Sequence, residues 1–120
     1  MPQPSAEEVF QQAVALHAQG NVLDAERLYR AVLLLDPNHF AGTLSLALLC
    51  AEHGRAGEAS TLLEAALARN PGSAPANSCL GDVLLSLGRS EQACTLYGAA
   101  LALQPDYVEA RYGLANALMS

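Results

Sequence analysis

The chain has 120 residues, of which 52% are hydrophobic and 5% aromatic, and its formal net charge is −6. This length favours a single domain, and an apolar content supplied mostly by alanine and leucine favours helices over strands. All six basic residues are arginines scattered along the sequence. Binding to nucleic acid or to an anionic membrane surface requires a basic stripe, so neither is expected.

The three cysteines, Cys50, Cys79 and Cys94, are odd in number and lack the spacing of a disulfide framework or a zinc site. The first ten residues show no basic segment followed by an apolar one, as a secretory signal would. No apolar run is long enough to span a bilayer. We therefore expect a reducing, cytoplasmic location, without membrane insertion, metal or cofactor.

The first predicted element is a helix that begins at about residue 6. Ser5 and Glu8 have the spacing of a capping box, in which each side chain accepts a hydrogen bond from a free backbone amide. Apolar residues then recur at helical spacing. Gly20 ends this helix, because glycine readily adopts the left-handed conformation that follows a last turn.

A second helix is predicted over residues 22–35. Pro37 lacks an amide hydrogen and disfavours helix in the residue before it, so the apolar run that precedes it is the end of a helix and not a strand. Asn38, Ser73 and Asp106 are candidate N-caps of the later helices, because their short polar side chains can accept a hydrogen bond from a free amide.

This pattern repeats without a gap, since the prolines at 37, 71 and 105 and the glycines at 20, 54 and 88 are each 34 residues apart. Rows of small and large apolar residues keep the same period. Each period holds two antiparallel helices, which predicts units at about 6–39, 40–73 and 74–107 and one further helix over 108–120. A single helix pair cannot bury both its faces, whereas stacked pairs can.

These rows resemble the tetratricopeptide repeat. The resemblance rests on Ala13, Leu16, Gly20, Ala25, Tyr29 and Pro37 in the first unit, on Leu46, Ala47, Gly54, Ala59, Leu63, Ala66 and Pro71 in the second, on Leu80, Gly81, Leu84, Gly88, Ala93, Tyr97, Ala100 and Pro105 in the third, and on Leu114, Ala115 and Leu118 in a partial fourth. It implies an all-α, right-handed superhelical solenoid of antiparallel helix pairs. The family often has an aromatic residue near the start of each first helix, where this chain has Val9, Thr43, Asn77 and Arg111.

Independent catalysis is not expected. A nucleophile needs a base within reach, but His17, His39 and His53 are scattered and none is paired with a serine or cysteine in a recognisable motif. The glycines recur at the repeat period and do not form a phosphate-binding loop.

In the tetratricopeptide family, the first helix of each pair lines a concave groove that binds a peptide or helix of a partner protein. Carried over by register, the groove here is lined by Glu7, Phe10, Val14, His17, Ala41, Leu44, Leu48, Glu52, Ser78, Asp82, Leu85, Ser86, Tyr112 and Asn116. The lining is mixed, with apolar and acidic side chains and no lysine or arginine. A partner with apolar anchors and basic flanks therefore fits better than an acidic tail. For Leu44 and Leu48, packing between neighbouring first helices remains an alternative.

Two other functions stay open. Leu114, Ala115 and Leu118 are predicted to form an apolar strip on the last helix, which indicates either self-association into a homo-oligomer or a chain that continues beyond Ser120. Arrays of this kind also occur fused to bacterial transferases, which suggests an N-terminal targeting domain. Among the cysteines, Cys50 belongs to the inward row and should be buried, whereas Cys79 should be partly exposed in the groove.

Overall fold

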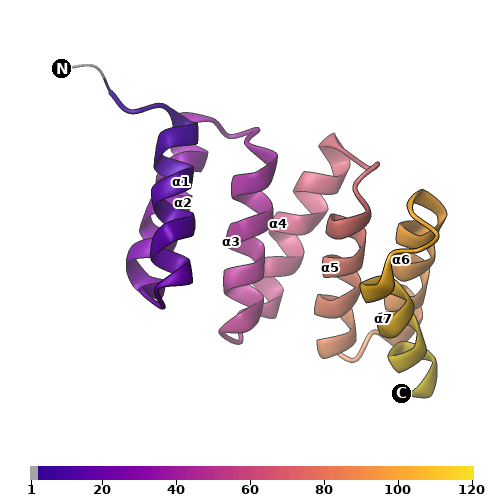
Figure 1. Ribbon diagram of the computed structural model, residues 1–120. Helices are drawn as coiled ribbons and strands as arrows, with labels where there is room; N and C mark the ends of the chain where they lie inside the picture. Colours follow the sequence, from indigo (N-terminus) through magenta and orange to yellow (C-terminus); the bar gives the residue numbers. More distant parts are fainter. Residues whose placement is uncertain (1–2) are drawn as a thin grey trace.

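The computed structural model describes residues 3–120, which form seven α-helices and, within that range, no strand. The helices are α1 (Ala6–Ala18), α2 (Val22–Leu35), α3 (Phe40–Glu52), α4 (Ala56–Arg69), α5 (Ala74–Ser86), α6 (Ser90–Leu103) and α7 (Val108–Met119). Each helix packs against the next one along the chain, and they stand side by side as antiparallel neighbours (Figure 1). The all-α solenoid predicted from the sequence is confirmed.

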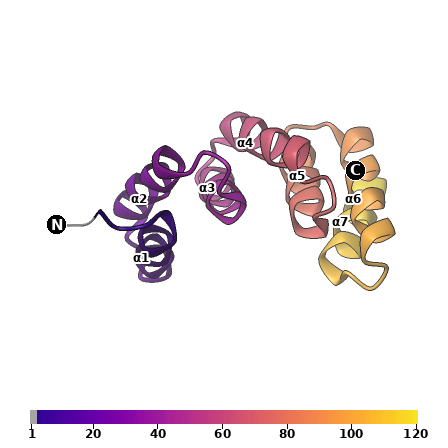
Figure 2. The same ribbon diagram turned by 90° about the horizontal axis from the view of Figure 1, so that it is seen from above.

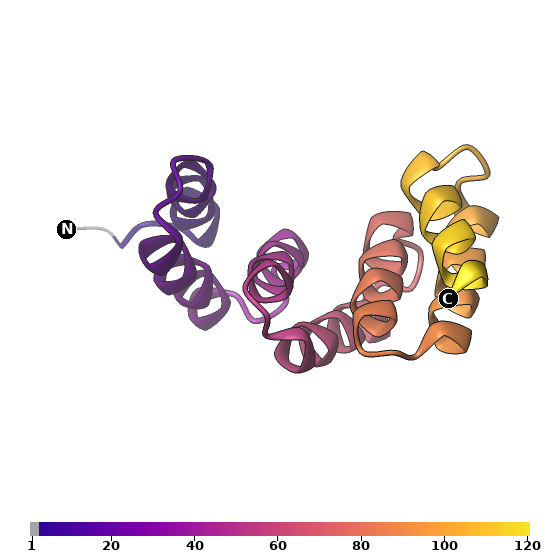
Figure 3. The ribbon, with the colours of Figure 1, turned by 90° about the horizontal axis from the view of Figure 1, so that it is seen from below.

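The stack is elongated, with extents of 54 × 26 × 22 Å. Viewed along the helices it curves into an arc, with α1, α3, α5 and α7 on the inner side and α2, α4 and α6 on the outer side (Figures 2 and 3). The odd-numbered helices therefore share the concave side of the arc.

None of the helices in residues 3–120 has the length and hydropathy needed to cross a bilayer.

The predicted start and stop signals are mostly confirmed. The Ser5 hydroxyl accepts from the Glu8 amide at 3.1 Å, and the Glu8 carboxylate accepts from the Ser5 amide at 3.2 Å, which completes the capping box. Ser73 caps α5 by accepting from the Ala76 amide. Gly20 adopts a φ of +84° after α1, and its counterparts at 54 and 88 do the same after α3 and α5.

Two predicted caps are wrong. The N-cap of α3 is His39 and not Asn38, and the His39 Nδ1 atom accepts from the Gly42 amide at 2.9 Å. The N-cap of α7 is Tyr107 and not Asp106, and its side chain makes no capping hydrogen bond. In both cases one more non-helical residue follows the polar residue, so its side chain is a residue too far from the free amides.

The core combines small residues where helices approach closely with large residues that fill the space beside them. Small residues with no exposed surface include Ala13, Ala25, Ala47, Ala59 and Ala93, and large residues with 1% or less include Tyr29, Leu46, Leu63 and Tyr97. Cys50 is buried, as predicted. Ala115 departs from its row because it is exposed, since no helix within residues 3–120 packs on that side of α7.

The ring of Tyr97 lies against two glycines on different helices. A Cβ atom added to Gly81 of α5 would lie 2.8 Å from the Tyr97 Cε1 atom, and one added to Gly113 of α7 would lie 2.5 Å from its Cζ atom. Real side-chain atoms do not approach so closely, so both positions exclude any residue larger than glycine unless the ring moves. These glycines serve packing and are not turn residues.

An ion-pair network on the outer side joins the first two helix pairs. Glu26 of α2 accepts from the guanidinium of Arg55 at 2.7 Å and from that of Arg30 at 2.7 Å, and Arg30 also donates to Glu58 of α4 at 2.7 Å. Arginines that are scattered in the sequence thus converge in the fold. Hydrogen bonds from Arg55 and Arg30 lower the pKa of Glu26 from 4.5 to about 2.

Replacing Glu26 with glutamine is expected to lower the free energy of unfolding by about 1 kcal/mol at neutral pH, since solvent screens pairs whose arginines are partly exposed. A carboxyl group whose pKa is lowered by folding stabilises the native state above its unfolded pKa. The difference in the free energy of unfolding between the wild type and the variant should therefore be fully present above pH 4.5 and vanish as the pH falls towards 2. Urea unfolding at a series of pH values measures it. An equal loss from Glu91→Gln, whose side chain forms no ion pair within residues 3–120, would contradict this account.

Candidate functional site

The odd-numbered helices lie on the concave side of the arc (Figure 3). We call this side the inner face and define it by the predicted site residues Val14, His17, Leu48, Glu52, Asp82, Tyr112 and Asn116. Its apolar members are accessible: Val14 is 39%, Leu48 41% and Tyr112 71% exposed. Exposed apolar side chains in a concave setting are what an interaction surface requires. Of the other predicted site residues, Phe10, Leu44 and Leu85 are half-buried and pack against the core.

A pocket of about 280 Å³ opens on this face between α3 and α5. We call it the α3–α5 pocket; it is lined by Ala47, Leu48, Ala51, Glu52, Leu63, Cys79, Asp82, Val83 and Ser86. It brings together four of the residues predicted to line the groove, Leu48, Glu52, Asp82 and Ser86. Its remaining lining is mostly apolar, so two carboxylates stand beside an otherwise hydrophobic hollow.

A second pocket of about 430 Å³ lies between α1 and α3 and is lined by Val14, His17, Ala18, Tyr29 and Ser45. Here His17 connects two helices, because its Nδ1 atom lies 3.1 Å from the Tyr29 hydroxyl and its Nε2 atom 3.1 Å from a Glu52 carboxylate oxygen. A neutral imidazole that accepts from Tyr29 and donates to Glu52 satisfies both contacts. The predicted site residues His17 and Glu52 are therefore partners.

The carboxylate of Asp82 is also held by a tyrosine from a helix on the outer side of the arc. The hydroxyl of Tyr97, a fully buried residue of α6, donates to its Oδ1 atom. Burial raises the pKa of Asp82, and burial together with this carboxylate raises the pKa of Tyr97. Burial also raises the pKa of the Cys79 thiol to about 11. The thiol is thus protonated at neutral pH, which is the opposite of what a redox-active cysteine needs.

Negative charge collects on the inner side of the arc. The helices α1, α3 and α5 contain no arginine or lysine. Arg111 of α7 turns away to donate to the backbone carbonyl of Pro105 at 2.9 Å. The inner face therefore offers carboxylates to a ligand without arginines to neutralise them.

The end of the inner face at α1 is closed by an aromatic cluster. The ring of Phe10 lies 5.0 Å from that of His39 and 6.1 Å from that of Tyr29. His39 must carry its proton on Nε2, because Nδ1 accepts the capping bond, and Nε2 lies 3.0 Å from a Glu7 carboxylate oxygen. Phe10 and Glu7, which the register assigned to the groove, thus each contact His39, although the Glu7 side chain remains 64% exposed.

At the opposite end, the predicted apolar strip is only partly present. Leu114 is half-buried and packs against the core, which corrects its assignment to an exposed strip. Leu118 is 70% exposed and lies next to the exposed Met119 at the end of α7, whereas the exposed Val108 lies at the start of that helix. The exposed apolar side chains of α7 therefore include Leu118, as predicted, but not Leu114.

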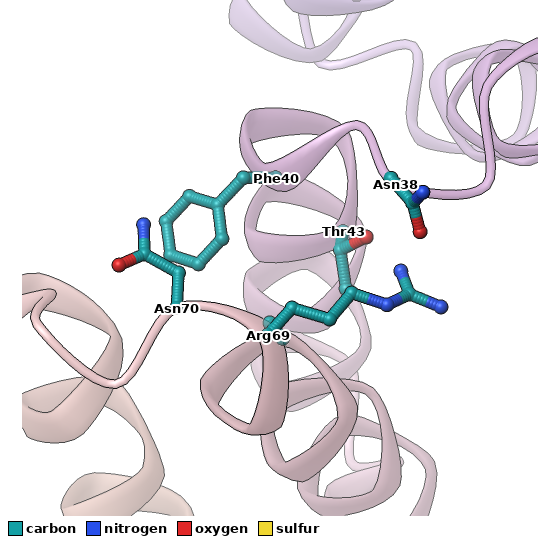
Figure 4. Close-up of a pocket in the computed structure, with 6 residues that line it drawn as sticks. Asn38, Phe40, Thr43, Arg69 and Asn70 are labelled. Carbon is teal, nitrogen blue, oxygen red and sulfur yellow. The ribbon is translucent and has the colours of Figure 1, made fainter.

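A larger hollow of about 550 Å³ lies outside the inner face, where the start of α3 meets the end of α4. Figure 4 shows the ring of Phe40 beside Asn70, and the guanidinium of Arg69 extending towards Asn38. Arg69 donates to the Pro37 carbonyl at 2.6 Å, so this arginine fastens the loop between the first two helix pairs.

Within residues 3–120 no three histidine, cysteine, aspartate or glutamate side chains are placed to hold a metal.

The residues that form the floor of the inner face were not predicted from the sequence. Tyr29 and Tyr97 were named only as members of the repeat rows, but their hydroxyls contact His17 and Asp82. The available signal was chemical, since a tyrosine in a buried row needs a partner for its hydroxyl. Val83 and Ser45, which line the two pockets, carried no comparable signal.

Comparisons with known proteins agree with this architecture. A family profile described as "Tetratricopeptide repeat" matches residues 16–78 and 51–96, and one described as "TPR repeat" matches residues 81–120. A comparison with curated proteins gives no match. Among solved structures, an O-GlcNAc transferase mutant from Thermobaculum terrenum is 36% identical with a TM-score of 0.90. That match covers 98% of this chain but 23% of the transferase, so the chain spans under a quarter of it.

Two smaller domains share the fold at lower identity. The first TPR domain of Spaghetti (RPAP3), bound to the HSP90 peptide SRMEEVD, is 22% identical with a TM-score of 0.92, and the match covers 96% of this chain and 91% of that one. The Sgt2 TPR domain from Aspergillus fumigatus is 19% identical with a TM-score of 0.90, over 98% and 80% of the two chains. The helix pairs, the 34-residue rows and the family profiles lead to one assignment: the chain belongs to the tetratricopeptide repeat family.

Proposed function

We propose that this chain is a non-catalytic protein-interaction module that binds a peptide or helical segment of a partner protein along its inner face. The observation that supports this most directly is the α3–α5 pocket, where apolar walls open to solvent beside the carboxylates of Glu52 and Asp82. Mostly apolar concave sites with a few polar groups are the usual form of a binding site. The exposed side chains of Val14 and Tyr112 extend the apolar surface on both sides of the pocket.

The ligand should differ from that of the Spaghetti domain. The peptide in that structure ends in two glutamates, a valine and an aspartate. The inner face described above carries carboxylates and no arginine that is free to meet an acidic tail. Like charges facing each other across an interface are unfavourable, so an acidic ligand of that kind is disfavoured here.

Replacing Leu48 with arginine is expected to weaken ligand binding by about tenfold or more, because it removes a central apolar contact and fills the pocket. A random peptide library displayed on phage would be selected on the immobilised chain. The enriched peptides would then be synthesised, and their affinity for the wild type and the variant measured by fluorescence anisotropy.

The matched control is Leu34→Arg, which makes the same chemical change at an 85% exposed leucine on α2 of the outer side. It should leave affinity unchanged. If no peptide is enriched, or if both variants weaken binding equally, the inner face is not the binding surface. Circular dichroism and thermal unfolding would establish that both variants are folded.

A second candidate is supported by the identity to the bacterial transferase, which is 36% over nearly the whole of this chain. We infer that the chain serves as the targeting part of a larger protein and presents partner segments to a catalytic domain. An antibody raised against these 120 residues would detect, in extracts of the source organism, a polypeptide much larger than the chain itself. A band of the size of the chain alone would exclude this arrangement.

A third candidate is self-association through α7, supported by the exposed side chains of Val108, Leu118 and Met119. Sedimentation equilibrium of the wild type and of Leu118→Glu separates this possibility from peptide binding. A monomer at all concentrations would remove it, while leaving the inner face untouched.

A further inference from the structure

We propose that the α3–α5 pocket is a subsite for an arginine or lysine side chain of the bound segment. The aliphatic part of that side chain lies against Leu48, Cys79 and Val83, and its cationic group lies at the carboxylates of Glu52 and Asp82. This inference rests on the proposed binding of a partner segment along the inner face, and it identifies the chemical class of that segment.

The lining of the pocket has the two parts that such a side chain needs. Its walls are apolar and come from both inner helices and, through Leu63, from α4 behind them. Glu52 and Asp82, one from each inner helix, add carboxylates to this lining. Long basic side chains place their methylene groups on apolar surface while their charged ends remain at a polar border. A purely apolar ligand side chain would make no use of the second oxygen of either carboxylate.

Both carboxylates are oriented, and each keeps one oxygen available. Glu52 uses Oε1 for His17, and Asp82 uses Oδ1 for the Tyr97 hydroxyl. Neither Oε2 of Glu52 nor Oδ2 of Asp82 accepts a hydrogen bond from any residue in the range 3–120. Acceptors that are already fixed in place lose little conformational entropy when a ligand donates to them.

The surroundings of Asp82 favour a cation over water as its partner. Burial raises the pKa of this carboxyl group, which means that its charged form is less well solvated than a free aspartate. The side chain still reaches solvent, and a cationic ligand group would replace the part of its hydration that the surrounding residues remove. A charge-assisted hydrogen bond in such a setting is stronger than a neutral one.

Within residues 3–120, no arginine forms an ion pair with Glu52 or Asp82. The helices that bear the two carboxylates contain no arginine or lysine, and the outer arginines Arg30 and Arg55 are paired with Glu26. The chain as a whole carries a charge of −6. Charge complementarity therefore selects a basic segment over an acidic or purely apolar one.

The test begins with the peptides selected from the phage library on the wild-type chain. We expect arginine or lysine to be enriched at one position next to an apolar residue. One such peptide would be resynthesised with citrulline in place of its arginine, which keeps the shape and removes the charge. Affinity should fall by about tenfold, as expected for loss of a charge-assisted hydrogen bond.

Asp82→Asn should cause a loss of similar size for the arginine peptide and almost none for the citrulline peptide. Asparagine still offers an oxygen to the Tyr97 hydroxyl, so the variant is expected to fold, and Glu52→Gln provides a second variant of the same kind. Asp24→Asn, an exposed position on α2, removes the same charge far from the pocket and is the control.

The two proposals fail in different ways. Selected peptides that depend on Leu48 but show no basic enrichment, or that bind Asp82→Asn and the wild type equally, would overturn the basic subsite and leave the binding face in place. An equal loss with Asp24→Asn would also overturn the subsite, since it would reveal only a long-range effect of net charge. A library that yields no peptide would overturn both.

Discussion

Replacing Gly113 with alanine is expected to lower the free energy of unfolding by about 1–3 kcal/mol, the usual cost of overpacking a core. The added Cβ atom would lie 2.5 Å from Cζ of Tyr97. That ring cannot easily withdraw, because it is fully buried, lies against Gly81 on another helix and is held through its hydroxyl by Asp82. Urea denaturation followed by circular dichroism measures the effect.

The control is the same substitution at Gly98, which lies in the interior of α6 with no atom within 4 Å of an added Cβ. There alanine should stabilise the protein by roughly 0.5–1 kcal/mol, because glycine is the weaker helix former. The two variants should therefore have effects of opposite sign. Stabilisation by Gly113→Ala would mean that the contact between α6 and α7 is looser than described.

The need for glycine at 113 is local to the last helix junction. The equivalent residues, 34 and 68 positions earlier, are Cys79 and Ser45, and each lines a pocket beside the large residue of the preceding helix, Leu63 or Tyr29. The residue at this position is thus smaller in the two units where it faces a tyrosine than in the unit where it faces a leucine. Periodicity shows which positions face each other, but the size that each position tolerates depends on the particular neighbour.

The helices were predictable because their signals are local and repeated. The second helix was predicted over 22–35 and is observed over the same residues, since Gly20 and Pro37 mark its two ends. The N-caps of α3 and α7 were misplaced by one residue. A cap is fixed by the backbone angles of a single residue, and Asn38 and Asp106 were chosen for side-chain chemistry alone.

The candidate site was predictable as a face but not as a set of contacts. Helical register placed Leu48 and Asp82 on the same side of the stack, and both line one pocket. It could not indicate that Phe10 packs on His39, or that Leu114 turns towards the core. These contacts depend on how far successive helix pairs are rotated and separated, which a one-dimensional period does not contain.

Replacing Leu63 with alanine is expected to have the largest effect of any variant considered, a loss of about 2–5 kcal/mol in the free energy of unfolding. Leu63 is 1% exposed and belongs to α4, which packs against α3 on one side and α5 on the other. The cavity would therefore open at the junction between the second and third helix pairs. Leu34→Ala, at an exposed position on α2, should change stability by no more than about 0.5 kcal/mol.

The position of Leu63 also determines how the protein should unfold. In a solenoid each helix pair contacts only its neighbours, so cooperativity depends on every junction between them. Weakening the α4–α5 junction should let α1–α4 and α5–α7 unfold separately, with a lower denaturant dependence than the wild type. Hydrogen exchange of amides in α2 and in α6 would then report two different opening free energies. An equal decrease in the opening free energy of both helices would show instead that the remaining contacts between α3 and α5 are sufficient to keep the array a single cooperative unit. These contacts border the α3–α5 pocket.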